Sequence, residues 1–511
     1  MSDTNFEIPE KLNIADWFLA DRVREGRGDR IALRADDGEL TYAEVDARAC
    51  RYAHRLRAAG VKPEQRVIVA MDDSADWVAT FFGILKAGAV AVMVNPGLKA
   101  DAIEYFLTYT RASAAVVDSG AEAAFRAAAA AAPHLESVLV AGTDDFETEL
   151  AASPTAFETF ASHRDDAAIW LFSGGTTGKP KAVVQSHNSF VNTTVLYGQR
   201  VLGYTEDDIT ISVPKLFFGY ATGSNLLFPF SVGASVVLFS GRCTPTVLCD
   251  QIERHRPSIL INVPTLINKM LAEETTAGRD LSSLRFSTSA GEALPVELYD
   301  RWKVAYGVEL LDGLGTAEQW HIFVSNQPDR VKPGTLGWVV PGFEVQVRDD
   351  DGNDLADGEI GNLWVRGNSR AIGYWQRMDR TMQAFRGEWY VSGDMVMRDA
   401  DGAFVYCGRG DDVLKVSGKW FEPSEVENCL LQHGAVRETV VVGVQIDGLM
   451  KPKAFVVATD EAEAGDELAD TLRQHVAETL DFYKAPRAIE FLEDFPRTHL
   501  GKINRDALKK L

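Results

Sequence analysis

Short apolar runs alternate with longer amphipathic stretches along much of the chain. The run 66–71 precedes an amphipathic stretch over 77–87, and the run 235–239 precedes another over 246–254. Runs of four to eight apolar residues are typical of buried strands, and apolar positions three or four apart are typical of one helix face. This alternation predicts an α/β protein in which helices cover parallel sheets.

The C-terminal part of the chain is expected to form a separate unit. A charged, glycine-bearing segment at 408–412 is followed by about 100 residues, a usual domain size. We expect a helix over 424–432, strands over 439–444 and 453–457, and a second helix with Leu468, Leu472, Val476 and Leu480 on one face. The sequence therefore predicts a large multi-sheet N-terminal domain over 1–410 and a small, mobile α+β domain over 411–511.

The charge balance excludes some classes of partner. The 511 residues include 52 Lys and Arg against 74 Asp and Glu, a formal net charge of −22. Nucleic acids and anionic membranes bind basic surfaces, so we expect neither as a partner. No basic, apolar leader and no run of about 18 apolar residues occur, which predicts a cytoplasmic protein. The five cysteines have no CxxC spacing and are expected to be reduced core thiols.

The segment 172–182, FSGGTTGKPKA, combines glycines, hydroxyls and two lysines after an apolar run at 167–172 that is expected to be a strand. Glycines let backbone N–H groups turn toward an anion, threonines add donors, and Lys179 and Lys181 offset polyphosphate charge. It is not a Walker A sequence, because Pro180 stands where that motif has Ser or Thr. The segment predicts a phosphate-binding loop outside the P-loop NTPases.

The same segment resembles the signature loop of the adenylate-forming superfamily: acyl- and aryl-CoA synthetases, peptide-synthetase adenylation domains and luciferases. Further motifs follow in the family order across essentially the full chain. The resemblance implies the adenylate-forming enzyme fold and attack of a carboxylate on the α-phosphorus of ATP. The residues implied to hold the phosphates are Ser173, Gly175, Thr176, Thr177, Gly178 and Lys181. Gly174 and Ala182 depart from the usual pattern, and Gly174 removes a hydroxyl donor.

The segments 289–295, 312–318 and 390–394 resemble the family's adenine, metal and ribose motifs. The residues implied to contact the nucleotide are Gly291, Glu292 and Ala293 along adenine, Asp312 on its amino group, Thr316 near the α-phosphate, and Asp394 and Arg409 on the ribose. Glu318 is implied to hold Mg²⁺, which prefers carboxylate oxygens. Leu314 replaces the stacking aromatic residue and Ala317 replaces a hydroxyl residue, although Thr316 offers a hydroxyl next to it.

The tail segment 496–505 is a polar loop that carries Lys502 beside a glycine. By the resemblance Lys502 is the catalytic residue, because one ammonium between the acid and phosphate oxygens stabilises the charge that accumulates during attack. The resemblance also implies a second closed state for thioester formation, reached by rotation about Asp411. In that state Gly418 would leave room for the pantetheine arm of coenzyme A.

The segments 214–223 and 318–326 narrow the likeness to benzoate-CoA ligases and related aryl-CoA ligases. The matched Gly219, Tyr220 and His321 are implied to wall a small flat pocket, with Gly291 permitting ring stacking. A slot of this kind suits a planar aromatic carboxylic acid better than a long alkyl chain.

Gln319 and Trp320 depart from the Met-Leu pair that is usual in this subgroup. Gln319 offers a hydrogen bond to a ring substituent or heteroatom, and Trp320 offers a smaller pocket. The alternative is that both side chains face away from the ligand. The identity of the aryl acid therefore stays open at this point.

Three functional hypotheses follow. The first is an ATP- and Mg²⁺-dependent aryl-CoA ligase. The second is a free-standing adenylation enzyme that loads the acid onto the phosphopantetheine of an acyl carrier protein instead of coenzyme A. The third is a catalytically inactive relative that serves as a binding protein, motivated by Gly174, Leu314 and Ala317. The presence of Lys502 and the other implied catalytic positions argues against this last hypothesis.

Overall fold

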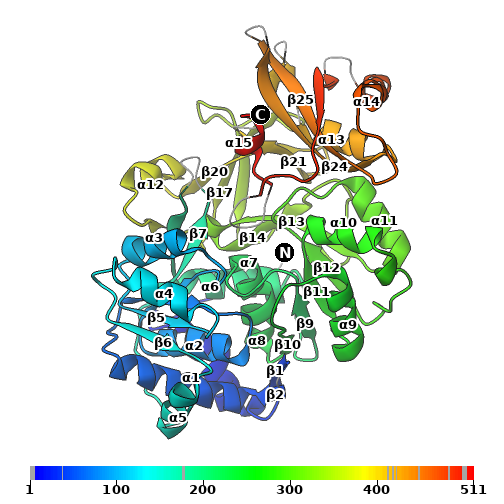
Figure 1. Cartoon of the computed structure of the whole chain (residues 1–511). Helices are drawn as coiled ribbons and strands as arrows, with labels where there is room; N and C mark the ends of the chain where they lie inside the picture. The colour runs from blue at the N-terminus through cyan, green and yellow to red at the C-terminus, as the bar shows by residue number, and fades with distance from the viewer. Residues whose placement is uncertain are drawn as a thin grey trace.

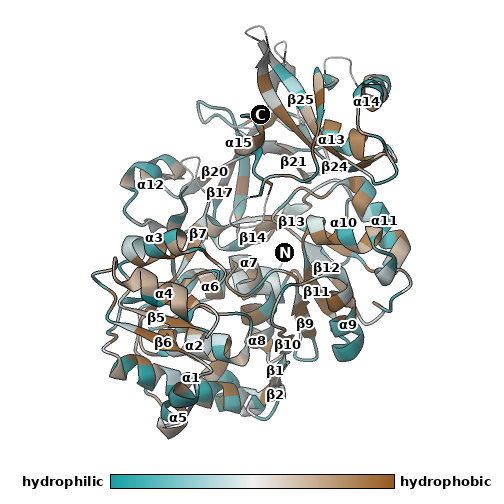
Figure 2. Ribbon diagram, viewed as in Figure 1, coloured by the Kyte–Doolittle hydropathy of each residue, from teal (hydrophilic) through white to brown (hydrophobic). Residues whose placement is uncertain are grey.

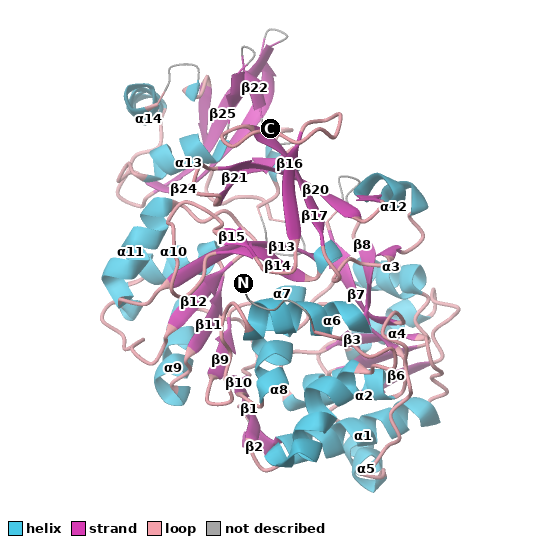
Figure 3. Cartoon of the chain, turned by 180° about the vertical axis from the view of Figure 1, so that it is seen from behind, coloured by secondary structure: helices cyan, strands magenta, loops and turns pink. Residues whose placement is uncertain are grey.

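A computed structural model of the chain describes residues 6–36, 38–174, 179–410, 414–416, 419–421, 423–446, 449–480, 484–497 and 503–511. Two extended sheets and their helices make up a large body, and the C-terminal residues form a small unit above it (Figure 1). Figure 3 gives the same arrangement from behind. The predicted α/β class, with a large N-terminal and a small C-terminal domain, is confirmed.

The first sheet has seven strands in the order β18-β8-β7-β4-β3-β5-β6. They are β3 (Arg66–Ala70), β4 (Val90–Met93), β5 (Ala114–Val117), β6 (Ser137–Val140), β7 (Ala167–Ser173), β8 (Lys181–Ser186) and β18 (Gly373–Tyr374). The pairs from β7 to β6 are parallel. Helices α1 (Tyr42–Ala58) and α2 (Ala75–Lys86) pack on the face of Val67 and Val69. Helices α3 (Ala100–Thr110) and α4 (Glu122–Ala129) pack on the face of Ile68. Helix α5 (Asp144–Ala152) lies against α1.

The second sheet has nine strands in the order β15-β14-β13-β12-β11-β9-β10-β1-β2. They are β1 (Ile31–Ala35), β2 (Gly38–Thr41), β9 (Ile209–Ser212), β10 (Ser235–Val237), β11 (Ile259–Asn262), β12 (Phe286–Ser289), β13 (Leu310–Thr316), β14 (His321–Ser325) and β15 (Trp338–Val339). The pairs from β1 through β10, β9, β11 and β12 to β13 are parallel. Helices α9 (Pro245–His255), α10 (Pro264–Ala272) and α11 (Val296–Tyr306) cover the face of Leu260 and Leu310.

The other face of the second sheet shares one core with the first sheet. Helices α6 (His187–Thr193), α7 (Gly219–Thr222) and α8 (Phe228–Val232) lie in this region, and Phe190 and Phe230 pack there with Phe82 of α2. The strands β9 and β11 are mostly hydrophobic, whereas α5 and α9 carry hydrophilic stretches (Figure 2). Buried strand faces thus hold the two sheets together.

A third sheet follows, in the order β16-β17-β20-β19, with β21 also paired to β20. Its elements are β16 (Glu344–Arg348), β17 (Ile360–Arg366), α12 (Met378–Ala384), β19 (Phe385–Arg386), β20 (Trp389–Arg398) and β21 (Phe404–Arg409). The C-terminal unit contains β22 (Leu414–Val416), β23 (Lys419–Phe421), α13 (Pro423–Leu431), β24 (Val436–Ile446), β25 (Leu449–Ala458), α14 (Asp466–Thr479), β26 (Ala488–Phe491) and α15 (Arg505–Leu508). Its own core includes Leu430, Val441, Ala454 and Leu472.

The predicted strands and helices named above are confirmed within a few residues. Strand β10 ends at Val237, two residues before the expected end. Helix α4 ends at Ala129, because N–H bonds from Ala131 and Ala132 to carbonyls three residues back tighten the chain ahead of Pro133. No disulfide joins the five cysteines, and four of them are buried. Within the described residues, no helix combines the length and apolar character needed to cross a bilayer.

Candidate active site

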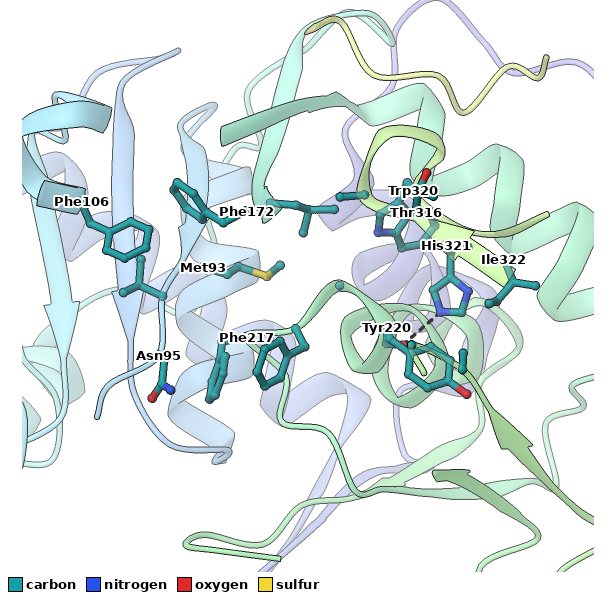
Figure 4. Close-up of a pocket in the computed structure, with 18 of the residues that line it drawn as sticks. Met93, Asn95, Phe106, Phe172, Phe217, Tyr220, Thr316, Trp320, His321 and Ile322 are labelled. Atoms are coloured by element: carbon teal, nitrogen blue, oxygen red, sulfur yellow. Dashed lines mark hydrogen bonds between the residues drawn. The ribbon is translucent and has the colours of Figure 1, made fainter. Parts of the chain in front are cut away.

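A cavity of about 210 Å³ opens where the first and second sheets meet (Figure 4). Its walls come from the carboxyl ends of the parallel strands β4, β7 and β12, from the segment leading into α7, and from the turn between β13 and β14. The lining residues are Met93, Val94, Asn95, Leu98, Phe106, Leu171, Phe172, Phe217, Phe218, Gly219, Tyr220, Ala290, Gly291, Gly315, Thr316, Ala317, Trp320, His321 and Ile322. Ligands of open α/β sheets bind at such strand ends, so the topology favours this cavity as a binding site.

His321 and Tyr220 form one end of the cavity, and their hydrogen bonds fix both rings. The Nε2 atom of His321 lies 3.0 Å from the carbonyl oxygen of Tyr220, which can only accept, so Nε2 carries the proton. Nε2 also lies 3.0 Å from the Ser224 hydroxyl. The Tyr220 hydroxyl lies 2.6 Å from that of Thr288 on β12. Burial lowers the pKa of His321 to about 4, which leaves a neutral ring at neutral pH.

The backbone at this end of the cavity is strained. Trp320 has φ of 32° and His321 has φ of 85°, a left-handed region that non-glycine residues rarely adopt. Two adjacent residues in this conformation are maintained only where surrounding packing enforces it. The buried turn between β13 and β14 therefore presents the His321 ring to the cavity in one fixed orientation.

All four residues that the sequence indicates for the acid pocket, Gly219, Tyr220, Gly291 and His321, line the cavity. The structure distinguishes the surroundings of Gln319 from those of Trp320. Trp320 belongs to the cavity lining, and its buried ring packs 4.3 Å from the ring of Phe190, centroid to centroid. Gln319 is fully buried and donates from Nε2 to the carbonyl of Val365 at 3.4 Å, so its side chain is turned toward β17. Trp320 is thus part of the cavity lining, and Gln319 is not.

Beside the cavity, three residues from the phosphate-loop and metal motifs converge. Ser173 ends β7 and Lys181 begins β8, and the two pair across these strands. The Glu318 carboxylate accepts from the Ser173 hydroxyl at 3.2 Å, and the Lys181 ammonium lies 4.0 Å away. Burial lowers the pKa of Lys181, while Glu318 acts in the opposite direction. A buried carboxylate next to a hydroxyl and an ammonium fits a magnesium-bound polyphosphate.

Tyr374 completes this group and was missed by sequence reasoning. Its hydroxyl donates to the Glu318 carboxylate at 2.7 Å, and the Lys181 ammonium lies 4.1 Å from the centre of its ring. Tyr374 belongs to β18, far along the chain from both partners, and a lone tyrosine in a short strand gives no functional signal. Its position depends on antiparallel pairing of β18 with β8.

We expect Tyr374→Phe to raise the Mg²⁺ concentration that gives half-maximal turnover by about 2- to 10-fold, the equivalent of one lost hydrogen bond. The ring contact with Lys181 is preserved, so the change isolates the hydroxyl. The measurement is a Mg²⁺ titration, followed both by pyrophosphate release and by the melting temperature with ATP. A variant with an unchanged Mg²⁺ requirement in both assays would contradict this role.

The residues implied to hold adenine and ribose lie on separate strands. Asp312 on β13 is buried, and its Oδ1 atom has no hydrogen-bond partner among the described residues, which fits acceptance from an external amino group. Burial raises the pKa of Asp312 well above its usual range. Asp394 on β20 and Arg409 on β21 are register partners joined by an ion pair of 3.0 Å.

The remaining implied residues differ in what their side chains do. Thr316 lines the cavity, and its hydroxyl accepts from the Gln319 N–H at 3.3 Å. The carboxylate of Glu292 accepts from the N–H and hydroxyl of Thr265 and so caps α10. Ala293 lies in the loop between β12 and α11. At the position that the resemblance assigns to adenine, Glu292 and Ala293 therefore offer backbone groups rather than a free polar side chain.

Other predicted residues fall outside the part of the chain that the structure describes. They are Gly175, Thr176, Thr177 and Gly178 of the phosphate loop, Asp411 and Gly418 of the hinge and thioester step, and Lys502. Their assigned roles stay predictions, as does the boundary at 410.

Sequence reasoning also missed the far end of the cavity, formed by Met93, Asn95 and Phe106. The available signal was Asn95, a polar residue two positions after the buried parallel strand β4.

Comparison with known families matches residues 20–375 to the AMP-binding enzyme model. The chain belongs to the AMP-binding enzyme family. The C-terminal domain of AMP-binding enzymes matches a second stretch, 425–502. The predicted resemblance to adenylate-forming enzymes is thereby confirmed, and the site described above belongs to an ATP-binding member of this family.

The relatives of this AMP-binding enzyme include AMP-forming aryl-CoA ligases. Benzoate-CoA ligase of Thauera aromatica is 40% identical, over 98% of this chain and 97% of its own. The crystal structure of the anthranilate CoA ligase AuaEII in complex with anthranoyl-AMP matches with a TM-score of 0.94 at 39% identity, covering 98% of each chain. A benzoate CoA ligase from Burkholderia xenovorans LB400 matches with a TM-score of 0.90 at 38% identity, covering 98% of this chain and 100% of its own.

Proposed function

We propose that this enzyme activates a benzoate-like aromatic acid with ATP and transfers the resulting aroyl group to coenzyme A. In the first step the carboxylate oxygen attacks the α-phosphorus of ATP, forming an aryl-adenylate as pyrophosphate leaves. In the second step the thiolate of coenzyme A attacks the aryl carbonyl, and AMP leaves with the bonding electrons. The product is an aryl-CoA thioester.

One observation carries the proposal: a cavity walled largely by aromatic side chains lies directly beside the group of Ser173, Lys181 and Glu318. Tyr220 and the neutral ring of His321 supply the apolar end, which suits an aromatic ring. Thr316 and Ala317 line the cavity next to Glu318, so a ring-bound carboxylate would face the phosphates. Residues of the predicted acid pocket thus line the cavity, and residues of the phosphate-loop and metal motifs lie next to it.

Different residues of the chain would bind the phosphates, the ribose and Mg²⁺ and would stabilise the transition state. Ser173 and Lys181 would hold phosphate oxygens, and the Asp394–Arg409 pair would position the ribose. Glu318 would hold Mg²⁺, whose bound charge offsets that of the leaving pyrophosphate. Lys502 would stabilise the charge that develops between the acid and the α-phosphate.

A panel of carboxylic acids tests the substrate class by ATP-dependent pyrophosphate release. The panel contains benzoate, hydroxybenzoates, aminobenzoates, heteroaryl acids and octanoate. We expect planar aryl acids to be turned over at least tenfold faster, per unit of concentration, than octanoate. Octanoate as the best substrate, or no turnover with any acid, would overturn the proposal.

The acceptor is tested separately with an acid that is turned over. Incubation with ATP and free coenzyme A should give the aryl-CoA thioester, seen by mass. A reaction that stops at the adenylate with free coenzyme A, but proceeds with a phosphopantetheinylated carrier protein, would favour the carrier-protein hypothesis instead.

A further inference from the structure

Asp73 is a buried carboxylate that the proposed chemistry does not use. It follows β3 at the carboxyl edge of the first sheet, immediately before the residues that begin α2, and is 6% exposed. Its Oδ1 atom accepts from the backbone N–H of Leu216 at 2.8 Å. This bond joins the first sheet to a segment 143 residues further along the chain.

Leu216 belongs to the turn that carries one wall of the cavity. The next four residues, Phe217, Phe218, Gly219 and Tyr220, all line the cavity. The Leu216 carbonyl accepts from the Thr222 hydroxyl at 2.6 Å, which closes the turn onto the start of α7. The Leu216 side chain is fully buried in the core shared by the two sheets. The bond from Asp73 therefore fixes the backbone from which the aromatic wall projects.

The charge of Asp73 is poorly compensated. Asp73 forms no ion pair among the described residues, and the nearby Lys215 ammonium is bonded to the Phe239 carbonyl at 2.6 Å. The other titratable groups around it are the exposed Asp72 and the thiol of Cys243. Burial raises the pKa of Asp73 to about 7, so the carboxyl changes charge near neutral pH.

A stability argument alone does not account for an aspartate here. An asparagine would accept the same Leu216 N–H without placing a charge in the core. The carboxyl, when ionised, makes a stronger hydrogen bond to that N–H than an amide oxygen does. A costly buried charge next to the wall of a binding cavity points to a role in function.

We propose that Asp73 is a positioning residue for the aryl acid: its carboxylate holds the Leu216 N–H and so sets the Phe217–Tyr220 wall of the cavity. This inference rests on the proposed function, because the ligand that the wall contacts is the aryl acid. Asp73 itself does not line the cavity.

Asp73→Ala tests the position, with Asp72→Ala as a matched control because Asp72 is the exposed neighbouring carboxylate. In the full chain we expect Asp73→Ala to raise KM for the best aryl acid at least tenfold, with KM for ATP changed less than twofold. Asp73→Asn keeps an acceptor and should restore KM to within about threefold of wild type. Equal increases in both KM values, or none, would overturn the inference.

The charge is tested by pH. The ordinary pKa of a carboxyl is about 4, so aryl acids stay ionised from pH 6 to pH 8. Asp73 ionises in this window, and its ionised form binds the Leu216 N–H more strongly, so KM for the acid should fall as pH rises in wild type. Asp73→Asn should lack this component.

Stability gives a second readout. The pKa of Asp73 is raised on folding, so its ionisation lowers the stability of the folded protein as pH rises from the pKa of the unfolded state to about 7. Asp73→Asn removes this cost. It should therefore raise the melting temperature more at pH 8 than at pH 5.5. A wild type with no acid-dependent turnover would count against the proposed function. If the wild type is active but its KM for the acid has the same pH dependence as that of Asp73→Asn, the result would contradict only the role proposed for Asp73.

Discussion

Lys502→Ala is expected to lower acid-dependent pyrophosphate release by about 10²- to 10³-fold, the usual effect of removing one group that stabilises transition-state charge. During attack on the α-phosphorus, negative charge increases on the acid and phosphate oxygens together, and Lys502 is the cation that the family resemblance places between them. KM values should change little, because the ammonium acts on the transition state more than on bound substrates.

The second half-reaction supplies the control within the same variant. Supplied with preformed aryl-adenylate and coenzyme A, Lys502→Ala should form thioester at a rate within about threefold of wild type, because no charge then builds up on an attacked phosphate. Lys510→Ala is the matched substitution, since Lys510 is an exposed lysine of the same tail. Near-normal pyrophosphate release from Lys502→Ala would remove the assigned role.

The α/β architecture was predictable from local pattern, because each strand and helix has its own periodicity. The runs at 66–71 and 167–172 became β3 and β7, and the helix faces with Leu468 and Leu472 became α14. The motifs also predicted which polar residues converge: Ser173, Lys181 and Glu318 come together although 145 residues separate the first from the last. The order of the motifs predicted these contacts, whereas hydrophobic periodicity does not indicate which polar residues come together.

The rest depends on contacts that no local pattern encodes. Tyr374 reaches Glu318 only because a two-residue strand pairs with β8, and Asp73 reaches Leu216 only because two sheets share one core. Gln319 and Trp320 are neighbours in sequence, but only Trp320 belongs to the cavity lining, while Gln319 is bonded to β17. The left-handed backbone at Trp320 accompanies this separation. Long-range packing, rather than propensity, decides these positions.

Gly223→Ala is expected to raise KM for the aryl acid by about tenfold or more, while KM for ATP stays within about twofold. Gly223 has an ordinary negative φ, so the substitution changes space rather than backbone freedom. A Cβ atom there would overlap Cδ2 of His321 and lie 2.6 Å from its Nε2 atom. Overpacking of this kind costs about 1–3 kcal/mol.

The ring of His321 has little room to yield, because Nε2 is held by the Tyr220 carbonyl and the Ser224 hydroxyl and the backbone of His321 is already strained. The methyl group must therefore push the ring toward the cavity or break both bonds, and either outcome alters the end that meets the aryl ring. Gly434→Ala is the matched control, since a Cβ there meets nothing within 4 Å.

A double variant separates this cause from general destabilisation. In His321→Ala the ring is gone, so adding Gly223→Ala should change KM for the acid by less than twofold, and the two effects should be strongly non-additive. Additive effects would mean that Gly223 acts through another contact. A fall in melting temperature with unchanged KM would mean that the His321 ring position is not what sets affinity for the acid.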